Sequence, residues 1–217
     1  MIGLLRLLFF GTIVRLVVLV IIGLRIIPRS QLPTTGPAII CANHNSHLDT
    51  MVLMTLFPLR SLAKLRPVAA AEYFMKNRLL AWFALQIVGI IPIARCKPSP
   101  TEHPLAKCSD ALARGEILII YPEGSRGEPE SLASFQSGIA HLAKLHPDVP
   151  IYPVFIYGLG KVLPKGELIL VPFFCDLAIG MPIFWNGKKQ AFMDLLDRQM
   201  QELSTLFNII TPDIDRS

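Results

Sequence analysis

Charged residues are scarce in this chain of 217 amino acids: Asp, Glu, Lys and Arg make up only 17% of it, whereas 52% of the residues are hydrophobic. Globular domains usually carry about 25% charged residues. A shortfall of this kind indicates contact with a membrane or with a long apolar ligand. The apolar content excludes a disordered protein because it can bury a full core, and the length fits one domain of ordinary size.

Cysteine is also sparse. The four cysteines form no Cys-x-x-Cys pair and lie in apolar or helical stretches (Cys41, Cys96, Cys108 and Cys175). This pattern argues against a disulfide framework and a structural zinc site, and it favours buried thiols in a reducing compartment, hence the cytoplasmic side. The net charge is +5, but no dense stripe of Lys and Arg is interleaved with aromatic residues. Nucleic acid is therefore not an expected partner.

The N-terminal segment is the longest apolar run. From Leu4 to Ile27 the only charged residues are Arg6, Arg15 and Arg25, and no small-x-small cleavage site follows. A helix over residues 2–27 would be about 39 Å long, enough to cross or lie along a bilayer. Its apolar side chains favour insertion by roughly 4–8 kcal/mol, which outweighs roughly 3 kcal/mol for a central Arg15. We expect residues 1–27 to attach the chain to a membrane, as a tilted span or a deeply embedded helix; a buried core helix is the alternative.

Short apolar runs alternate with helical patterns after a linker over residues 28–37. The runs expected as strands are Ala38–Ala42, Pro67–Ala71, Gly89–Arg95, and segments near Ile151–Tyr157 and Leu168–Phe174, and Glu116–Gly124 is expected to pass from a strand into a loop. Helices are expected after Ser46 and over about Tyr73–Val88, Glu102–Arg114, Ser137–Leu145 and Lys188–Phe207. This alternation predicts an α/β fold with a mostly parallel sheet covered by helices. Because no repeat or internal boundary is visible, residues 28–217 are expected to form a single domain.

The motif NHNSHLD (Asn43–Asp49) follows the first expected strand and starts a helix, and Ser46 and Asp49 have the spacing of a capping box. In α/β sheets, ligands bind at the carboxyl ends of strands. The turn can bring the carboxylate of Asp49 to the imidazole of His44, which would make a general base with its orienting partner. Two alternatives stay open: a helix cap beside a polar loop histidine, or a metal site of His44, His47 and Asp49. No further ligand cluster is visible, so we expect no metal.

A second motif, YPEGSRG (Tyr121–Gly127), also follows an apolar run. Its two glycines allow the backbone to approach a ligand closely, and Arg126 offers a fork suited to phosphate. Glu123 could orient that guanidinium or accept a hydrogen bond from a substrate hydroxyl. The motif is not the nucleophile elbow of serine hydrolases, because position 123 is Glu where that elbow requires Gly. A purely structural turn is the alternative.

These two motifs, together with GIIPIAR (Gly89–Arg95) and VPIYPV (Val149–Val154), resemble the four sequence blocks of the glycerolipid acyltransferase family in order and spacing. That family includes the 1-acylglycerol-3-phosphate acyltransferases. SFQSGIAHLA (Ser134–Ala143) resembles the stretch that follows the family's third block. The resemblance covers about Pro37 to Tyr157; its first and third blocks are specific, whereas the second and fourth are weak alone.

The resemblance implies an enzyme of phospholipid biosynthesis that moves a fatty acyl group from acyl-CoA or acyl carrier protein to a lysophospholipid, 1-acyl-sn-glycerol 3-phosphate, to give phosphatidate. It implies that His44 is the general base, that Asp49 orients it, and that no covalent acyl-enzyme forms. It places the acceptor's glycerol phosphate against Arg95, Glu123, Gly124 and Arg126. No cofactor is expected beyond the thioester co-substrate. The expected partners are that donor, acyl carrier protein, a lipid acceptor and the cytoplasmic face of a membrane.

The sequence departs from the family pattern in three places. AAAEYF (Ala69–Phe74) lacks a Lys that many members carry there, Ser125 stands where Thr is commoner, and the segment before the first block is short for a two-helix membrane motif. Other acceptors therefore stay open, such as glycerol 3-phosphate or another lysolipid. Two other classes also stay open: an acyl-thioester hydrolase in which His44 activates water, and a non-catalytic lipid-binding membrane protein.

Overall fold

Strands and helices alternate along the chain in the computed structural model, which describes residues 2–20, 22–28, 30–46, 48–94, 104–124, 132–162 and 173–210. The strands are β1 (Ile22–Pro28), β2 (Ala38–Ala42), β3 (Leu65–Ala70), β4 (Ile91–Ile93), β5 (Ile117–Ile120), β6 (Ile151–Tyr157) and β7 (Phe173–Ile179). The α-helices are α1 (Ile2–Leu8), α2 (Arg15–Val20), α3 (Leu48–Thr55), α4 (Ala71–Phe74), α5 (Arg78–Trp82), α6 (Ala106–Ala113), α7 (Gly138–Leu145), α8 (Leu159–Val162) and α9 (Lys189–Ile210). Two π-helical stretches join α1 to α2 (Phe9–Val14) and extend α5 (Phe83–Val88), and a 3-10 helix spans Leu59–Lys64.

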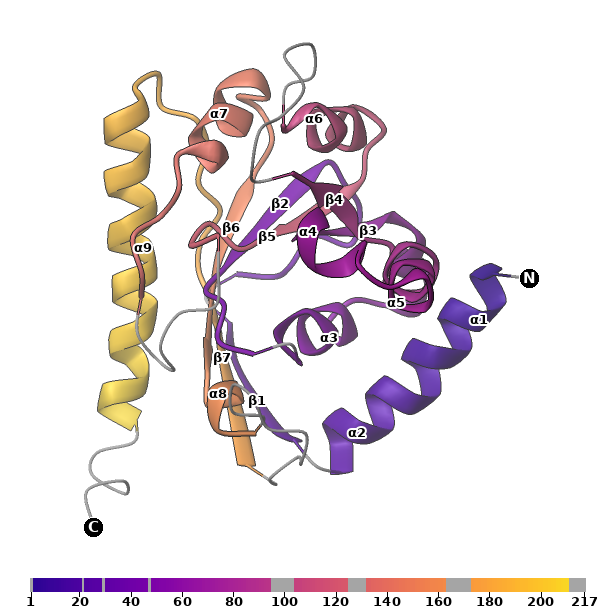
Figure 1. Cartoon of the computed structure of the whole chain (residues 1–217). Helices are drawn as coiled ribbons and strands as arrows, with labels where there is room; N and C mark the ends of the chain where they lie inside the picture. Colours follow the sequence, from indigo (N-terminus) through magenta and orange to yellow (C-terminus); the bar gives the residue numbers. More distant parts are fainter. Residues whose placement is uncertain are drawn as a thin grey trace.

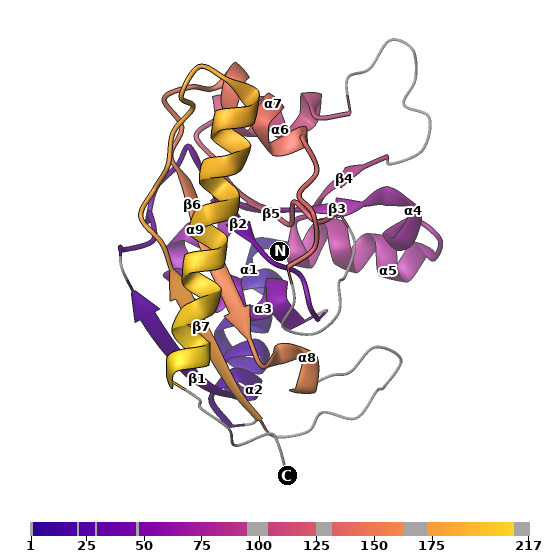
Figure 2. The same cartoon turned by 90° about the vertical axis from the view of Figure 1, so that its left-hand side faces the viewer.

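The strands form one sheet in the order β1-β7-β6-β2-β5-β3-β4. Neighbouring strands are parallel except β6 and β7, which pair antiparallel. Parallel strands need crossover connections, and the helices provide them on both faces of the sheet (Figure 2). The predicted α/β fold with a mostly parallel sheet is therefore confirmed.

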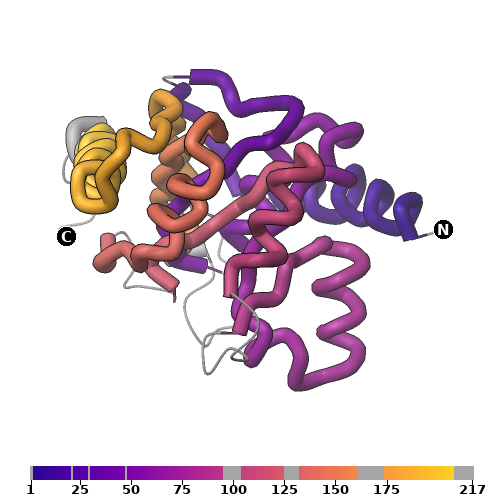
Figure 3. The backbone as a smooth tube through the Cα atoms, turned by 90° about the horizontal axis from the view of Figure 1, so that it is seen from above, coloured from indigo at the N-terminus to yellow at the C-terminus, as the bar shows by residue number. Residues whose placement is uncertain are grey.

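The sheet separates two hydrophobic cores. Successive side chains of a strand point to opposite faces, so in β2 the residues Ala38, Ile40 and Ala42 enter one core, and Ile39 and Cys41 enter the other. The first core is covered by α3 and by the N-terminal helix (α1 to α2), and the second by α6, α7 and α9 (Figure 1). Seen from above, the N-terminal helix and α9 lie on opposite sides of the molecule (Figure 3).

The helix predicted over residues 2–27 is too long. It ends at Val20, and residues 22–28 form the edge strand β1, which pairs with β7. Two features explain the difference: this segment is rich in β-branched isoleucine and contains Gly23, which both favour leaving a helix, and Arg25 finds an ionic partner on β7. The guanidinium of Arg25 donates two hydrogen bonds to the carboxylate of Asp176, at 2.8 and 2.7 Å. Residues 2–20 are thus helical, and residues 22–28 are a strand of the sheet.

The N-terminal helix packs along the domain. Phe10, Val14 and Val18 are buried in the first core, at a spacing of four residues that places them on one helix face. Arg6 is buried on the same side, and its guanidinium donates hydrogen bonds to the backbone oxygens of Leu65 (3.1 Å) and Val88 (2.9 Å). The domain itself therefore supplies two acceptors to an arginine whose charge disfavours membrane insertion.

Four other predicted elements can be compared with the structure. The strands predicted at Ala38–Ala42 and Ile151–Tyr157 are confirmed residue for residue. The helix predicted over Tyr73–Val88 is divided, because the side chain of Asn77 caps α5 by accepting hydrogen bonds from two backbone N–H groups, at 2.8 and 3.3 Å. The strand predicted near Leu168–Phe174 lies further along, at Phe173–Ile179, and residues 163–172 are outside the described part of the chain.

We expect Arg6→Met to lower the free energy of unfolding by about 2 kcal/mol, or the melting temperature by roughly 4–8 °C, because it leaves two buried carbonyl oxygens without a donor. The measurement is thermal unfolding of the purified full chain in detergent. Arg15→Met on the same helix is the control, since Arg15 makes one long hydrogen bond, of 3.5 Å, to the backbone oxygen of Phe57. Equal losses in the two variants would contradict an anchoring role of Arg6.

Candidate active site

The carboxyl ends of β2 and β5, which are parallel neighbours, bring the two sequence motifs together. His44 lies in the turn after β2, and Asp49 lies in the first turn of α3. The Nδ1 atom of His44 is 2.8 Å from Oδ2 of Asp49. The pairing that was predicted from a spacing of five residues is therefore present. With its Nδ1–H donated to the carboxylate, the imidazole presents Nε2 as the nitrogen that can accept a proton.

The carboxylate of Asp49 also closes the turn. Its Oδ2 accepts hydrogen bonds from the backbone N–H groups of Asn45 (2.7 Å) and Ser46 (2.8 Å), and Ser46 Oγ accepts one from Leu48 N (3.3 Å). The bond from Ser46 N to Asp49 is that of a capping box, and Ser46 Oγ caps the N–H group two residues on. The helix cap and the histidine partner, which the sequence posed as alternatives, are thus the same carboxylate.

The ring of Tyr121 packs against one face of the His44 imidazole. The rings of His44 and Tyr121 are stacked, with centroids 4.1 Å apart and planes 20° apart. The Tyr121 hydroxyl is 2.9 Å from Oγ1 of Thr50, and burial raises the pKa of Tyr121 well above its ordinary value, so the phenol stays neutral. Sequence reasoning did not single out this residue. The available signal was its position directly after a strand expected to end at the site.

Asn43 is a second residue that the sequence analysis missed. Its side chain is fully buried and pairs with the backbone of Ile156 on β6: Oδ1 accepts from Ile156 N at 2.7 Å, and Nδ2 donates to Ile156 O at 2.9 Å. The amide thereby continues the β2–β6 pairing one step beyond the end of β2. This pairing fixes the strand end from which the His44 turn departs.

Glu123 lies close to the turn and is almost fully buried. Its Oε1 accepts a long hydrogen bond, 3.3 Å, from the backbone N–H of His44, and its Oε2 has no hydrogen-bond partner among the described residues. Burial raises the pKa of Glu123 to about 7; the hydrogen bond from His44 opposes this, and the nearby charge of Asp49 adds to it. Near neutral pH this carboxyl is therefore partly protonated.

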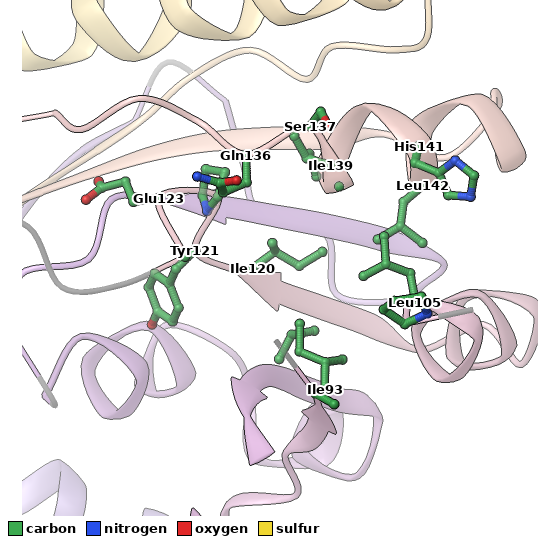
Figure 4. Close-up of a pocket in the computed structure, with 16 residues that line it drawn as sticks. Ile93, Leu105, Ile120, Tyr121, Glu123, Gln136, Ser137, Ile139, His141 and Leu142 are labelled. Atoms are coloured by element: carbon green, nitrogen blue, oxygen red, sulfur yellow. The ribbon is translucent and has the colours of Figure 1, made fainter. Parts of the chain in front are cut away.

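Tyr121 and Glu123 line a cavity of about 750 Å³. Glu123 and Tyr121 lie at one end of it, and His141 and Leu105 lie at the other (Figure 4). Its floor is apolar and comes from β3, β4 and β5, with side chains Val68, Ile93 and Ile120. Gly124, which also lines the cavity, has a left-handed backbone (φ +74°), a conformation that L side chains rarely adopt. Glycine at this position therefore allows the chain to turn beside the cavity.

The other predicted binding residues, Arg95 and Arg126, lie outside the described residues, as does His47. The described neighbours Ala94 and Gly124, from which the chain runs on to the two arginines, both line the cavity. Within the ranges that the structure describes, no group of three or more His, Cys, Asp or Glu side chains could hold a metal ion. The roles predicted for His44, Asp49, Glu123, Gly124 and the two arginines remain predictions.

Comparison with known proteins identifies the family. A match to the Acyltransferase family covers residues 24–157, more than half of the chain, so the chain belongs to the acyltransferase family. The fold agrees with a crystal structure of a 1-acyl-sn-glycerophosphate acyltransferase, PlsC, from Thermotoga maritima. The TM-score is 0.73 with 18% sequence identity, over 94% of this chain and 79% of the other.

Particular relatives carry a more specific name. The chain is 29% identical over 145 residues to the chloroplastic 1-acyl-sn-glycerol-3-phosphate acyltransferase LPAT1 of Arabidopsis thaliana. The aligned residues cover 67% of this chain and 37% of that protein. It is 26% identical over 195 residues to 1-acyl-sn-glycerol-3-phosphate acyltransferase alpha of Bos taurus. Here the aligned residues cover 88% of this chain and 66% of that protein. The chain thus spans about a third to two thirds of the length of these relatives.

We expect Glu123→Gln to become more stable relative to the wild type as the pH rises from 5 to 8, by up to about 3 kcal/mol. The pKa of Glu123 is raised to about 7 in the folded chain. At pH values between the ordinary pKa of a glutamate and 7, Glu123 loses its proton in the unfolded chain and keeps it in the folded chain. The wild type therefore loses stability as the pH rises. Glutamine does not titrate and removes this loss. Thermal unfolding at several pH values measures the difference.

Glu116→Gln is the control for this experiment. Burial raises the pKa of Glu116, but hydrogen bonds from Arg66 (3.0 Å) and Arg114 (3.2 Å) outweigh burial and hold it below its ordinary value. The stabilising effect of the Glu116 carboxylate is therefore fully present at any pH above the ordinary pKa of a glutamate. We expect Glu116→Gln to show a constant loss of stability between pH 5 and 8. A constant difference for Glu123→Gln as well would show that Glu123 is ionised throughout this range.

Proposed function

We propose that this protein is an O-acyltransferase that moves a fatty acyl group from a thioester of coenzyme A or acyl carrier protein to the free hydroxyl of 1-acyl-sn-glycerol 3-phosphate, which gives phosphatidate. The observation that carries the proposal is the 2.8 Å contact between His44 Nδ1 and Asp49 Oδ2 at the end of β2. The family of the chain and the names of its relatives support this reaction.

In the proposed reaction His44 acts as the general base. Its Nε2 takes the proton of the acceptor hydroxyl while the hydroxyl oxygen attacks the thioester carbonyl. A C–O bond forms, the C–S bond breaks, and the proton passes from the imidazolium to the departing thiolate. Asp49 stabilises the imidazolium between these steps and keeps Nε2 pointed at the substrate. A thioester is already activated, so positioning and a base near neutral pKa suffice without a nucleophilic side chain.

The acceptor headgroup would occupy the cavity beside Glu123. We place its phosphate against Arg95 and Arg126, because the described residues that precede them in the chain, Ala94 by one position and Gly124 by two, line the cavity. Guanidinium groups bind phosphate through two parallel hydrogen bonds. The apolar floor of the cavity is suited to the carbon atoms of a lipid acceptor.

We also propose that the protein works at the cytoplasmic face of a membrane. Within the described residues one helix, Ile2–Val20, is long and apolar enough to cross a membrane. The three cysteines that the structure describes are buried free thiols, which suits a reducing compartment. A membrane location gives the enzyme direct access to a lipid acceptor.

The first test is His44→Ala. We expect kcat for acyl transfer to fall by about 100- to 10,000-fold, because this is the usual contribution of a general base. The assay follows phosphatidate formation from 1-acyl-sn-glycerol 3-phosphate with acyl-CoA and, separately, with acyl carrier protein thioester. His146→Ala is the matched control, because His146 lies at the end of α7 and contacts Ser109 instead of the site. Release of free fatty acid at the same rate with and without the acceptor would identify a thioester hydrolase and refute the proposal.

The second test is Arg126→Ala. We expect KM for the acceptor to rise about 10- to 100-fold with a smaller change in kcat, because charge-assisted hydrogen bonds to the phosphate are lost. Arg126→Lys should restore binding only in part, since lysine cannot bind phosphate through a planar fork. Arg198→Ala, at an exposed position of α9, is the control. An unchanged KM in Arg126→Ala would refute the phosphate site.

A further inference from the structure

Two contacts restrain the imidazole of His44, and they act in different directions. Its Nδ1 atom bonds to Oδ2 of Asp49 at 2.8 Å. Hydrogen bonds tolerate about 30° of misalignment, so this contact fixes the position of one nitrogen more firmly than the tilt of the ring. The stacked ring of Tyr121 contacts one face of the imidazole, with centroids 4.1 Å apart and planes 20° apart. The stack therefore restrains the tilt, and the tilt decides where Nε2 points.

Tyr121 is held by the same helix that carries Asp49. Its hydroxyl oxygen lies 2.9 Å from Oγ1 of Thr50, which follows Asp49 in the first turn of α3. The contacts form a closed circuit, which runs from the imidazole to the carboxylate, along one peptide of α3 to the threonine, and back through the phenol. Because consecutive residues of one helix hold the two groups that touch the imidazole, those groups keep a fixed position relative to each other.

The tyrosine ring is suited to a base that becomes positively charged. Burial raises the pKa of Tyr121 well above its ordinary value, and the charge of Asp49 adds to this effect, so the ring stays a neutral phenol. The face of such a ring carries a negative partial charge and attracts cations. The stack therefore becomes stronger when His44 takes a proton. A contact that strengthens as the proton moves lowers the barrier of that step.

A simpler role for Tyr121 is that of a cavity wall, because the residue also lines the cavity of about 750 Å³. The two roles differ in their kinetic effect. A wall contacts the substrate before and during the reaction, so its loss raises KM. A group that orients the base acts on the chemical step, so its loss lowers kcat with little change in KM.

We propose that Tyr121 is a positioning residue for the general base: its ring fixes the tilt of the His44 imidazole, and the hydroxyl of Thr50 fixes the ring. This role rests on the proposed function only in that His44 takes a proton from a hydroxyl. It applies equally where that hydroxyl belongs to water, so it can be tested whether the acyl group passes to a lipid or the thioester is hydrolysed.

Two substitutions at position 121 separate the ring from its hydroxyl. We expect Tyr121→Leu to lower kcat about 10- to 30-fold, which is the usual strength of aromatic stacking and cation–π contacts together. Tyr121→Phe keeps the ring and should lower kcat only about threefold, since it loses one hydrogen bond that acts indirectly. KM for 1-acyl-sn-glycerol 3-phosphate and for acyl-CoA should change by less than about twofold in both variants.

A double-mutant cycle tests whether Thr50 acts through Tyr121. Thr50→Val keeps the shape of the side chain and removes its hydroxyl, and we expect it too to lower kcat about threefold. Combined with Tyr121→Phe, the loss should stay at about threefold instead of about ninefold, because both substitutions break the same contact. Thr55→Val on the same helix is the matched control: that hydroxyl donates to the backbone oxygen of Val52 at 2.7 Å, and kcat should not change.

The stack can also be observed without turnover. The chain contains five histidines, so ¹³C labelling of the histidine rings gives few NMR signals, and His44→Ala identifies the one of interest. Protons near the face of an aromatic ring are shifted upfield. We expect this shift for the ring protons of His44 in the wild type and in Tyr121→Phe, and its loss in Tyr121→Leu. Melting temperatures of the purified full chains in detergent show whether each variant is folded; should Tyr121→Leu not fold, the double-mutant cycle decides alone.

Three results would overturn the proposal. A higher KM with unchanged kcat in Tyr121→Leu would identify Tyr121 as a cavity wall. Losses that multiply in the double variant would show that Thr50 and Tyr121 act independently. An unshifted His44 signal in the folded wild type would show that the two rings do not stack in solution. Release of free fatty acid independent of the acceptor would instead refute acyl transfer, and the same ratios of kcat, measured on that release, would still support the role of Tyr121.

Discussion

A single oxygen atom, Oδ2 of Asp49, holds the candidate active site together. It accepts hydrogen bonds from His44 Nδ1 and from the backbone N–H groups of Asn45 and Ser46, all within 2.8 Å. All three donors lie on the turn between β2 and α3, so closing the turn and orienting the imidazole are one event. The carboxylate is fully buried, which excludes water from competing for these bonds. The imidazole therefore keeps one ring nitrogen committed to Asp49 and the other available to a substrate.

The sequence could predict this pair because every part of it is local. Five residues separate His44 from Asp49, a buried strand precedes them, and Ser46 with Asp49 has the spacing of a helix cap. The stacked ring of Tyr121 could not be predicted in the same way. Its place depends on the parallel register of β2 and β5, in which Cys41 pairs with Ile120. Periodicity shows that both segments are strands, but neither their adjacency nor their register, so contacts across the sheet appear only in the structure.

The N-terminal segment shows the complementary limit. Hydropathy reports how apolar a segment is, and it correctly predicted an apolar helix at the start of the chain. It does not report which partners the polar residues find elsewhere in the chain. Arg6 binds the backbone oxygens of Leu65 and Val88, which lie 59 and 82 positions further along the chain. Arg25 binds the carboxylate of Asp176, which lies 151 positions further along. The first contact keeps the helix against the domain, and the second belongs to a strand where the sequence predicted helix.

The surroundings of the two site carboxyl groups divide their roles. Each group has one buried oxygen without a partner among the described residues, but the other oxygen of Asp49 has three donors, whereas that of Glu123 has one long hydrogen bond. Burial consequently raises the pKa of Glu123 to about 7. A neutral Glu123 adds no negative charge to the cavity and can donate a hydrogen bond into it. An anionic headgroup in that cavity would disfavour the ionised form further, so binding of the proposed acceptor and protonation of Glu123 would reinforce each other.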